Sequence, residues 1–230
     1  MRIPLKGLIK NVSADCVIFG FENSSLKVLL FHRAKQPCRG MWALPGGFLL
    51  KGELIEQSAR RILKATTGIS KIYLEEIGVF DDIDRFPPWR VFTIGYFALV
   101  SPGNYKLTPN AVDSSEAKWY DIHELPELPW DHEKILNVAL KRLRTSVRLR
   151  PIGFELLPEK FTLPQLQALY EAVLGKELDK RNFRKKIMKM NLLTKLNEKD
   201  TNNVKRRAHL YEFDQKNYHE LKQQGFVFEL

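Results

Sequence analysis

The sequence predicts an α/β sandwich followed by a C-terminal winged helix-turn-helix domain. Two observations predict the sandwich: apolar, β-rich runs recur between residues 12 and 120, and one amphipathic, helix-like stretch interrupts them. A third observation predicts the second domain, because two helix-like segments and then two strand-like segments follow residue 150. The chain has 230 residues, and a single domain commonly has about 100 to 150, so two domains fit.

The composition indicates a globular protein of a reducing compartment. The apolar content is 44%, with seven Tyr, four Trp and 14 Phe. No apolar run approaches the roughly 20 residues that span a bilayer, and Met1–Val12 lacks the apolar core of a signal peptide. Cys16 lies in a strand-like run and Cys38 in a loop-like one, which argues against a disulfide framework. We expect a cytoplasmic protein without a membrane partner.

The elements of the sandwich are predicted in order along the chain. Val12–Phe21 and Leu26–Arg33 have the apolar, β-branched composition of strands, and the polar segment Glu22–Ser25 forms the turn between them. Beyond the central helix, three further strands are expected at Ile72–Phe80, Val91–Val100 and Ala117–Tyr120. A closing helix is expected to begin at Asp131 and to end near Leu143.

The central stretch carries a specific motif. Gly47 is followed after five residues by Glu53, after seven more by Arg61, and then by Leu63, Gly68 and Ile69, with Trp42, Leu44, Pro45 and Gly46 leading in. This spacing resembles the Nudix box, GX5EX7REUXEEXGU, in which U is aliphatic. The resemblance implies the Nudix α/β/α sandwich.

Three positions of the box depart from the pattern. Ile62, Ala65 and Thr66 stand where the family has glutamates that share one helix face and hold divalent metal. Ile62 and Ala65 offer no ligand atom, and a threonine hydroxyl is a poor substitute for a carboxylate. The sequence therefore predicts no metal site, no cofactor, no catalytic residue and little or no Nudix hydrolysis, with Glu53 and Arg61 paired to fix the loop and helix.

A ligand is still expected in the sandwich. Asp84, Arg85, Pro87 and Arg90 resemble a run found in proteins close to the ADP-ribose pyrophosphatases, and the likeness covers about residues 10 to 145. Arginines suit phosphates, and aspartates accept from sugar hydroxyls. Trp89 could stack on a ring, whereas Trp42 and His132 suit packing or capping. The candidate ligand-binding residues, each of which could equally sit in a surface ion pair, are Arg33, Glu53, Asp81, Asp84, Arg85 and Arg90.

The positive charge of the chain belongs to its C-terminal part. Residues 141–230 carry 20 Lys and Arg against 11 Asp and Glu, whereas residues 1–140 are nearly neutral. Lys141–Arg150 contains five basic residues and no acid, and Pro151 and Gly153 follow it. We place the boundary there, which gives a ligand-sensing domain at 1–148 and a DNA-binding domain at 149–230.

The C-terminal elements have the order of a winged helix. Thr162 and Gln165 have the spacing of a capping box before an apolar stripe, and Gly175 is a natural stop. Asp179 can cap a second helix that buries Phe183 and Ile187 and exposes a basic face. Strands at Leu193–Leu196 and His209–Phe213, around a polar loop, then form the wing. The candidate DNA-binding residues are Lys180, Arg181, Asn182, Arg184, Lys185, Lys186, Lys189, Lys205, Arg206 and Arg207.

The chain thus resembles, essentially end to end, the bacterial Nudix-related transcriptional regulators (NrtR-like), which include arabinose-responsive, AraR-like members. The domain entry at Pro151–Phe154 and the second helix at Asp179–Lys185 carry this likeness. The resemblance implies a homodimeric repressor that binds double-stranded operator DNA and senses a nucleotide sugar such as ADP-ribose or a sugar such as arabinose.

Two other functions stay open on the sequence. The first is a hydrolase of the ADP-ribose pyrophosphatase type that uses Glu53, Glu56 and acids of Asp113–Glu116. In the second, the C-terminal domain is a protein-interaction module with an incidental basic surface. Magnesium-dependent release of AMP would identify the hydrolase, and a shallow salt dependence of DNA binding would favour the interaction module.

Overall fold

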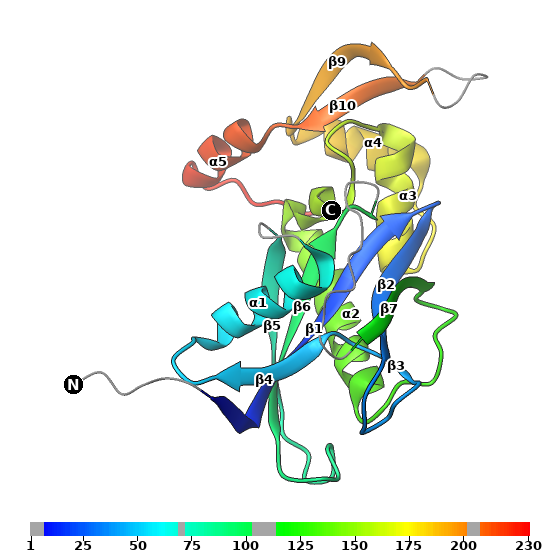
Figure 1. Ribbon diagram of the computed structural model, residues 1–230. Coiled ribbons are helices and arrows are strands. Elements are labelled where there is room, and N and C mark those ends of the chain that lie inside the picture. Colours follow the sequence, from blue (N-terminus) through cyan, green and yellow to red (C-terminus); the bar gives the residue numbers. More distant parts are fainter. Residues whose placement is uncertain (1–6, 69–71, 103–113, 202–207) are drawn as a thin grey trace. The chain divides into compact units, whose positions relative to one another are not determined.

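The computed structural model describes residues 7–68, 72–102, 114–201 and 208–230 (Figure 1). The chain divides into two compact units, and the division falls between Arg142 and Leu143. Two short segments that precede this point, one of them Phe21–Leu26, group with the second unit. The boundary expected after residue 148 stays a prediction.

A seven-stranded mixed sheet forms the centre of the first unit. Its strands are β1 (Leu8–Glu22), β2 (Ser25–Arg33), β3 (Trp42–Ala43), β4 (Gly46–Leu50), β5 (Tyr73–Phe80), β6 (Phe92–Val100) and β7 (Ser114–Asp121). The order is β3-β2-β1-β6-β5, with β4 on β1 and β7 on β2. The central strands β1 and β6 run parallel, whereas β4, β7 and β5 pair antiparallel with their neighbours.

Two helices complete the sandwich. Figure 1 shows α1 (Ile55–Thr67) in front of the sheet and α2 (His132–Leu149) behind it. The face of α1 that carries Ile62 and Leu63 packs into a core with Ala14, Cys16 and Ile18 of β1, which alternate along that strand. Gly68, with φ of 74°, ends α1 in the left-handed conformation. The α/β/α architecture predicted from the sequence is confirmed.

The predicted strands are found, with ends that differ by a few residues. The strands β3 and β4 were not predicted, because they are short and β4 begins with two glycines. The expected end of the closing helix near Leu143 is wrong, since α2 continues to Leu149. Leu143 and Val147 are buried one turn apart, so the apolar stripe continues through the basic stretch.

The second unit has the winged-helix architecture. Its elements are η2 (Pro151–Leu156), β8 (Phe161–Thr162), α3 (Leu163–Leu174), α4 (Lys180–Lys189), β9 (Leu193–Lys199), β10 (His209–Phe213) and α5 (Gln215–Gln223). The strands form an antiparallel sheet in the order β8-β10-β9. No helix within the described residues has both the length and the apolar content needed to cross a membrane.

Capping residues define the helix-turn-helix. The Thr162 hydroxyl accepts from the Gln165 N–H at 3.3 Å, and the Gln165 side chain accepts from the Thr162 N–H at 2.7 Å, which completes the predicted capping box. Gly175, with φ of 66°, ends α3, and the Asp179 carboxylate accepts from the Asn182 N–H at 2.8 Å to begin α4. Each predicted cap is thus present.

Candidate functional site

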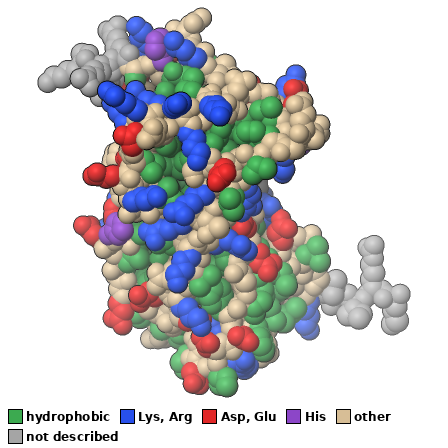
Figure 2. Space-filling model, turned by 180° about the vertical axis from the view of Figure 1, so that it is seen from behind, with side chains coloured by type: hydrophobic (Ala, Val, Ile, Leu, Met, Phe, Trp, Pro, Cys, Tyr) green, Lys and Arg blue, Asp and Glu red, His purple; other side chains and the backbone are tan. Residues whose placement is uncertain are grey.

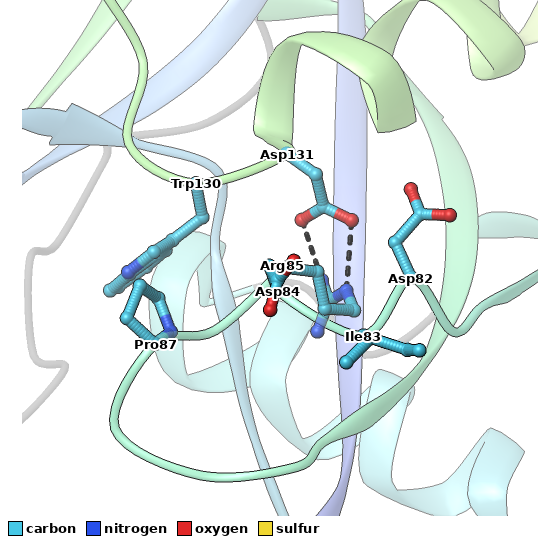
Figure 3. Close-up of a pocket in the computed structure, with 7 residues that line it drawn as sticks. All are labelled: Asp82, Ile83, Asp84, Arg85, Pro87, Trp130 and Asp131. Carbon is cyan, nitrogen blue, oxygen red and sulfur yellow. Dashed lines mark hydrogen bonds and ion pairs between the residues drawn. The ribbon is translucent and has the colours of Figure 1, made fainter.

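A pocket of about 460 Å³ opens in the first unit between the β5–β6 loop and the start of α2. Small-molecule sites commonly have volumes of roughly 300 to 1,000 Å³. Figure 3 shows the Arg85 side chain directed at the Asp131 carboxylate, with the Trp130 ring beside Pro87. The residues that line the pocket are Asp82, Ile83, Asp84, Arg85, Pro87, Trp130 and Asp131.

A buried ionic cluster lies at this pocket. Arg85 donates two hydrogen bonds to Asp131, at 2.8 and 2.7 Å, in the bidentate arrangement that best matches a guanidinium to a carboxylate. A terminal nitrogen of Arg85 also lies 3.6 Å from Asp15 Oδ2, and Nε2 of His132 lies 3.9 Å from the same oxygen. Asp15 stands on β1 and Arg85 on the β5–β6 loop, so the cluster joins segments distant in sequence.

Burial shifts two protonation equilibria in opposite directions. Removal of Asp15 from water raises the pKa of its carboxyl to about 7, against the lowering effect of Arg85. Burial, together with the charges of Arg85 and Arg33, lowers the pKa of His132 to about 3, so its ring is neutral at pH 7. Nδ1 of His132 accepts the Leu44 N–H at 3.0 Å, which assigns the ring proton to Nε2, the nitrogen that faces Asp15.

Gly46, at the start of β4, lets the strand approach the Asp15 carboxylate. A Cβ at position 46 would lie 1.9 Å from Asp15 Oδ1 and 3.3 Å from the carbonyl oxygen of Ala14. Both neighbours are constrained, because the carboxylate is buried and the carbonyl belongs to the backbone of β1. Glycine at this position is therefore a requirement of the cluster.

Aromatic rings continue from the pocket towards the surface. Trp130 contacts Phe86 at 5.4 Å between ring centroids, Phe86 contacts Trp89 at 4.9 Å, and Trp89 stacks on Phe48 at 6.1 Å. The guanidinium of Arg33 lies 4.7 Å from the centroid of Trp130. Trp130 has φ of 56°, a left-handed backbone conformation that is costly for a bulky residue. Trp89 is 43% exposed and contacts Phe86, whose chain neighbours Arg85 and Pro87 line the pocket.

The structure brings some of the predicted ligand-binding residues to the pocket and holds others away from it. Arg85 and Asp84 line the pocket, and Arg33 reaches it through Trp130. Arg90 packs its guanidinium 4.7 Å from the ring centroid of Phe92, and its buried terminal nitrogen Nη1 has no hydrogen-bond partner among the residues that the structure describes. Asp81 is exposed on the β5–β6 loop and does not line the pocket.

Glu53 belongs to a structural pair rather than to the pocket. Its carboxylate accepts from Arg61 at 2.6 and 3.0 Å and from the Leu50 N–H at 2.6 Å. The hydrogen bonds from Arg61 are the main reason that the pKa of Glu53 falls to about 2. The predicted pairing of Glu53 with Arg61 is thus present, and because Arg61 also donates to the Phe48 carbonyl at 3.1 Å, the pair ties α1 to β4 as well.

The second half of the Nudix-box helix does not fit a divalent metal. Ile62 is buried in the apolar core, Ala65 has no ligand atom, and the Thr66 hydroxyl donates to the carbonyls of Ile62 and Leu63. Within the described part of the chain, no group of three or more His, Cys, Asp or Glu residues could hold a metal ion. Ile69 and Asp113 lie outside the described residues. The described residues of this helix therefore do not support a metal-dependent catalytic step.

Sequence reasoning missed three residues: Trp130 and Asp131, which line the pocket, and Asp15, which belongs to the buried ionic cluster at the pocket. Asp15 is the one acid inside the apolar run of β1, and an acid in such a run must find a buried partner. That signal was available in the sequence. The contact of Trp130 with Arg33 depends on the tertiary fold and has no local signal.

The second candidate site is the exposed face of α4. Phe183 and Ile187 are buried beneath the helix, and Phe183 packs on Tyr170 of α3 with ring centroids 5.7 Å apart. Arg184 is partly buried, and its buried Nε has no hydrogen-bond partner within the described ranges of the chain. Figure 2 shows Lys and Arg side chains gathered on the visible surface of the second unit. The exposed polar residues of α4 are Lys180, Arg181, Asn182, Lys185, Lys186 and Lys189.

Within the described part of the chain, no salt bridge or side-chain hydrogen bond occupies any of the five exposed cations of α4. An exposed cation without an acid beside it is available to a polyanion. The basic residues predicted on the wing, Lys205, Arg206 and Arg207, lie outside the described residues. The strands β9 and β10 that flank them are present and pair antiparallel, with His209 opposite Lys199.

Comparison with known proteins identifies both units. Residues 10–140 match the NUDIX domain family, and residues 153–213 match the NrtR DNA-binding winged helix domain. The chain is 32% identical to the ADPR responsive transcriptional repressor NtrR of Acinetobacter baylyi, over 90% of this chain and 83% of that protein. It is also 37% identical to an ADP-ribose pyrophosphatase of Methanocaldococcus jannaschii, over 51% of this chain and 68% of that enzyme.

The fold has a solved counterpart over most of its length. A crystal structure of Shewanella oneidensis NrtR complexed with a 27mer DNA superposes with a TM-score of 0.78 and 31% identity. The superposition covers 88% of this chain and 93% of that one. The likeness therefore includes the sandwich and the winged helix together.

Proposed function

The chain belongs to the Nudix family, in the group that carries the NrtR winged-helix domain, and on this premise we propose that it is a transcriptional repressor controlled by ADP-ribose. In this proposal the second unit binds double-stranded operator DNA. The first unit binds the effector in the pocket between the β5–β6 loop and α2. Effector binding then changes the affinity for the operator.

The exposed basic face of α4 is the observation that carries DNA binding. In a helix-turn-helix, the second helix enters the major groove with its N-terminal residues on the base edges. Arg181 and Asn182 stand in the first turn of α4, where they can donate to bases, and Lys185 and Lys189 follow on exposed positions that suit phosphates. The similarity to a regulator solved with DNA supports this role.

The pocket suits a nucleotide sugar. Arg33 supplies positive charge at the Trp130 ring, the exposed Asp84 can accept from ribose hydroxyls, and the partly exposed Trp89 is an aromatic side chain that a purine could contact. Both curated relatives described above act on or respond to ADP-ribose by name. A sugar such as arabinose gains no support from these comparisons, and ADP-ribose is the effector we propose.

We propose that the first unit senses its ligand without hydrolysing it. Ile62, Ala65 and Thr66 stand at the three positions where the Nudix-box pattern has metal-binding glutamates. The Ile62 and Thr66 side chains are buried. Glu53 is already occupied by Arg61 and a backbone N–H, which leaves it a poor metal ligand or base. One observation supports the hydrolase alternative, namely the likeness of this unit to an ADP-ribose pyrophosphatase. Release of AMP is therefore measured in parallel.

We further propose that the protein acts as a homodimer. A winged helix places one recognition helix in one half-site, and two copies read half-sites about one helical turn apart or a multiple of it. A change in the spacing of the two α4 helices by a few ångströms would then weaken operator binding. This gives the effector a physical means of control, provided that it binds one arrangement more tightly than the other.

The test is a titration of the purified chain on the DNA upstream of its own gene at physiological salt. Fluorescence anisotropy gives the operator Kd with no ligand, with ADP-ribose and with arabinose, and a scrambled duplex measures non-specific binding. Parallel tubes with magnesium are assayed for AMP. We expect sequence-specific binding that ADP-ribose weakens, no effect of arabinose and no AMP. Equal affinity for both duplexes would reject the regulator, and Glu53-dependent release of AMP would restore the hydrolase.

A further inference from the structure

We propose that Arg144 of α2 is a positioning residue that holds the helix-turn-helix in the arrangement through which the effector controls DNA binding. The inference deepens the proposed function and rests on it. It assigns a role to a side chain that lies neither at the pocket nor on the exposed face of α4.

Arg144 reaches the end of α3. Its Nε donates to the Val173 carbonyl at 2.9 Å, and a Cβ on Gly175 would lie 3.2 Å from one of its terminal nitrogens. The guanidinium therefore lies against the residue at which α3 stops. The last carbonyls of a helix lack intrahelical donors and carry the negative end of its dipole, so a cation there makes a charge-assisted hydrogen bond.

The end of α3 is also the start of the turn that orients α4. Glu171 accepts from the Leu178 N–H at 2.9 Å, and Gln167 donates to the Leu178 carbonyl at 3.0 Å, so α3 fixes the far side of this turn. Arg144 holds its near side at Val173 and Gly175. Because α4 begins directly after the turn, a displacement of the Arg144 guanidinium moves the first turn of α4, which carries the candidate base-reading residues.

The other end of the same helix is fixed to the pocket. Asp131 directly precedes α2, its carbonyl accepts the Ile135 N–H at 3.0 Å, and its carboxylate holds Arg85 of the pocket. The division between the two units falls inside α2, after Arg142, so Asp131 belongs to the first unit and Arg144 to the second. One uninterrupted helix thus carries an attachment to the ligand pocket and an attachment to the turn of the helix-turn-helix. Rigid secondary elements and the hydrogen bonds that attach them can carry energetic coupling between distant sites.

The closing experiment compares Arg144→Gln with Arg142→Gln in the full chain. Arg142 is a matched control, since it is an arginine on the same helix whose Nε pairs with Glu75 at 3.3 Å, on the surface of the first unit. For each protein, anisotropy gives the operator Kd with and without saturating ADP-ribose, and the ratio is the coupling factor. Calorimetry gives the Kd of ADP-ribose.

Coupling factors are commonly about 5 to 150, and we expect Arg144→Gln to reduce the factor about fivefold or to abolish it. The Kd of ADP-ribose should stay within about twofold, because the substitution is away from the pocket, and Arg142→Gln should keep the parent's factor. Arg144→Lys should retain part of it, because a cation remains at the end of α3.

An unchanged factor in Arg144→Gln overturns the proposal, and so does an equal loss in Arg142→Gln. If Arg144→Gln does not fold, Arg144→Lys decides: a factor below the parent's supports the role, and a factor equal to it overturns it. Failure of the proposed function is seen separately, in the parent protein, as absence of specific operator binding or of any response to ADP-ribose.

Discussion

The ligand pocket of the first unit and the exposed face of α4 in the second both depend on charged side chains, but they use the charge in opposite ways. At the pocket, Arg85 is buried between Asp131 and Asp15. On α4, Lys185 and Lys189 are exposed, without an acid beside them in the described residues. A buried charge must be paired, so it fixes geometry, whereas a free surface cation can exchange its counterions for phosphate. Changes at the two regions should therefore alter different quantities.

The largest effect is expected from Asp131→Ala. It leaves the Arg85 guanidinium, whose side chain is 5% exposed, without its bidentate partner. Removal of one member of a buried pair commonly costs about 3 to 5 kcal/mol, and because Asp15 remains 3.6 Å away we expect about 3 kcal/mol in the free energy of unfolding. Urea denaturation measures it. Lys134→Ala, which breaks an exposed pair between α2 and Asp82 of the β5–β6 loop, is the control and should change nothing measurable. A comparable loss of unfolding free energy in both variants would contradict the distinction between buried and exposed charge pairs.

Gly46→Ala tests how tightly the buried cluster is packed. The new Cβ would meet Asp15 Oδ1 at 1.9 Å, so either the carboxylate or β4 must move. Forced overpacking of a core commonly costs about 1 to 3 kcal/mol, and we expect a loss of about 2 kcal/mol, again by urea denaturation. Gly47→Ala is the matched control, because its Cβ would lie 3.6 Å from Ile62 Cδ1, an ordinary contact. Equal stability of the two variants would show that the Asp15 carboxylate or β4 moves aside at no measurable cost.

Asp15→Asn should expose a pH dependence that the cluster conceals. Between about pH 4.5 and 6, the folded state holds a proton on Asp15, whose pKa is raised to about 7, and the unfolded state does not, so this group lowers stability as pH rises. His132, with its pKa lowered to about 3, is protonated only in the unfolded state, so it raises stability as pH rises. The two contributions cancel in the parent.

In Asp15→Asn only the contribution of His132 remains. The free energy of unfolding should then rise by about 1.4 kcal/mol per pH unit from pH 4.5 to 6, which is the value for one proton. Urea denaturation at several pH values measures this slope, and the parent should give a slope near zero. His132→Gln serves as the opposite control, with stability that falls over the same range. A flat profile in Asp15→Asn would show that the two groups do not oppose each other.

Local patterns in the sequence predicted the elements but not the cluster. The caps at Thr162, Gly175 and Asp179 were predictable because each depends on residues within three or four positions. The end of α2 was not, because five basic residues obscured the buried stripe that includes Leu143 and Val147. Asp15 could be recognised as an unusual acid in a strand, but its partners come from other segments of the chain, and only the tertiary fold brings them together.

The smallest effect is expected on α4, where Lys185→Ala should change binding and leave stability alone. Lys185 is exposed and has no ion-pair partner among the described residues, so its removal exposes no buried group. In the proposed function it neutralises one phosphate, and the slope of log Kd against log salt should decrease in magnitude by about 0.9. Anisotropy titrations at four salt concentrations measure the slope.

Lys64→Ala, an exposed lysine of α1, is the control and should keep the parent's slope. An unchanged slope in Lys185→Ala would remove this lysine from the DNA interface. A uniformly shallow slope in all three proteins would instead indicate a surface for another protein, and the contrast between paired and free charge would then lose its functional meaning.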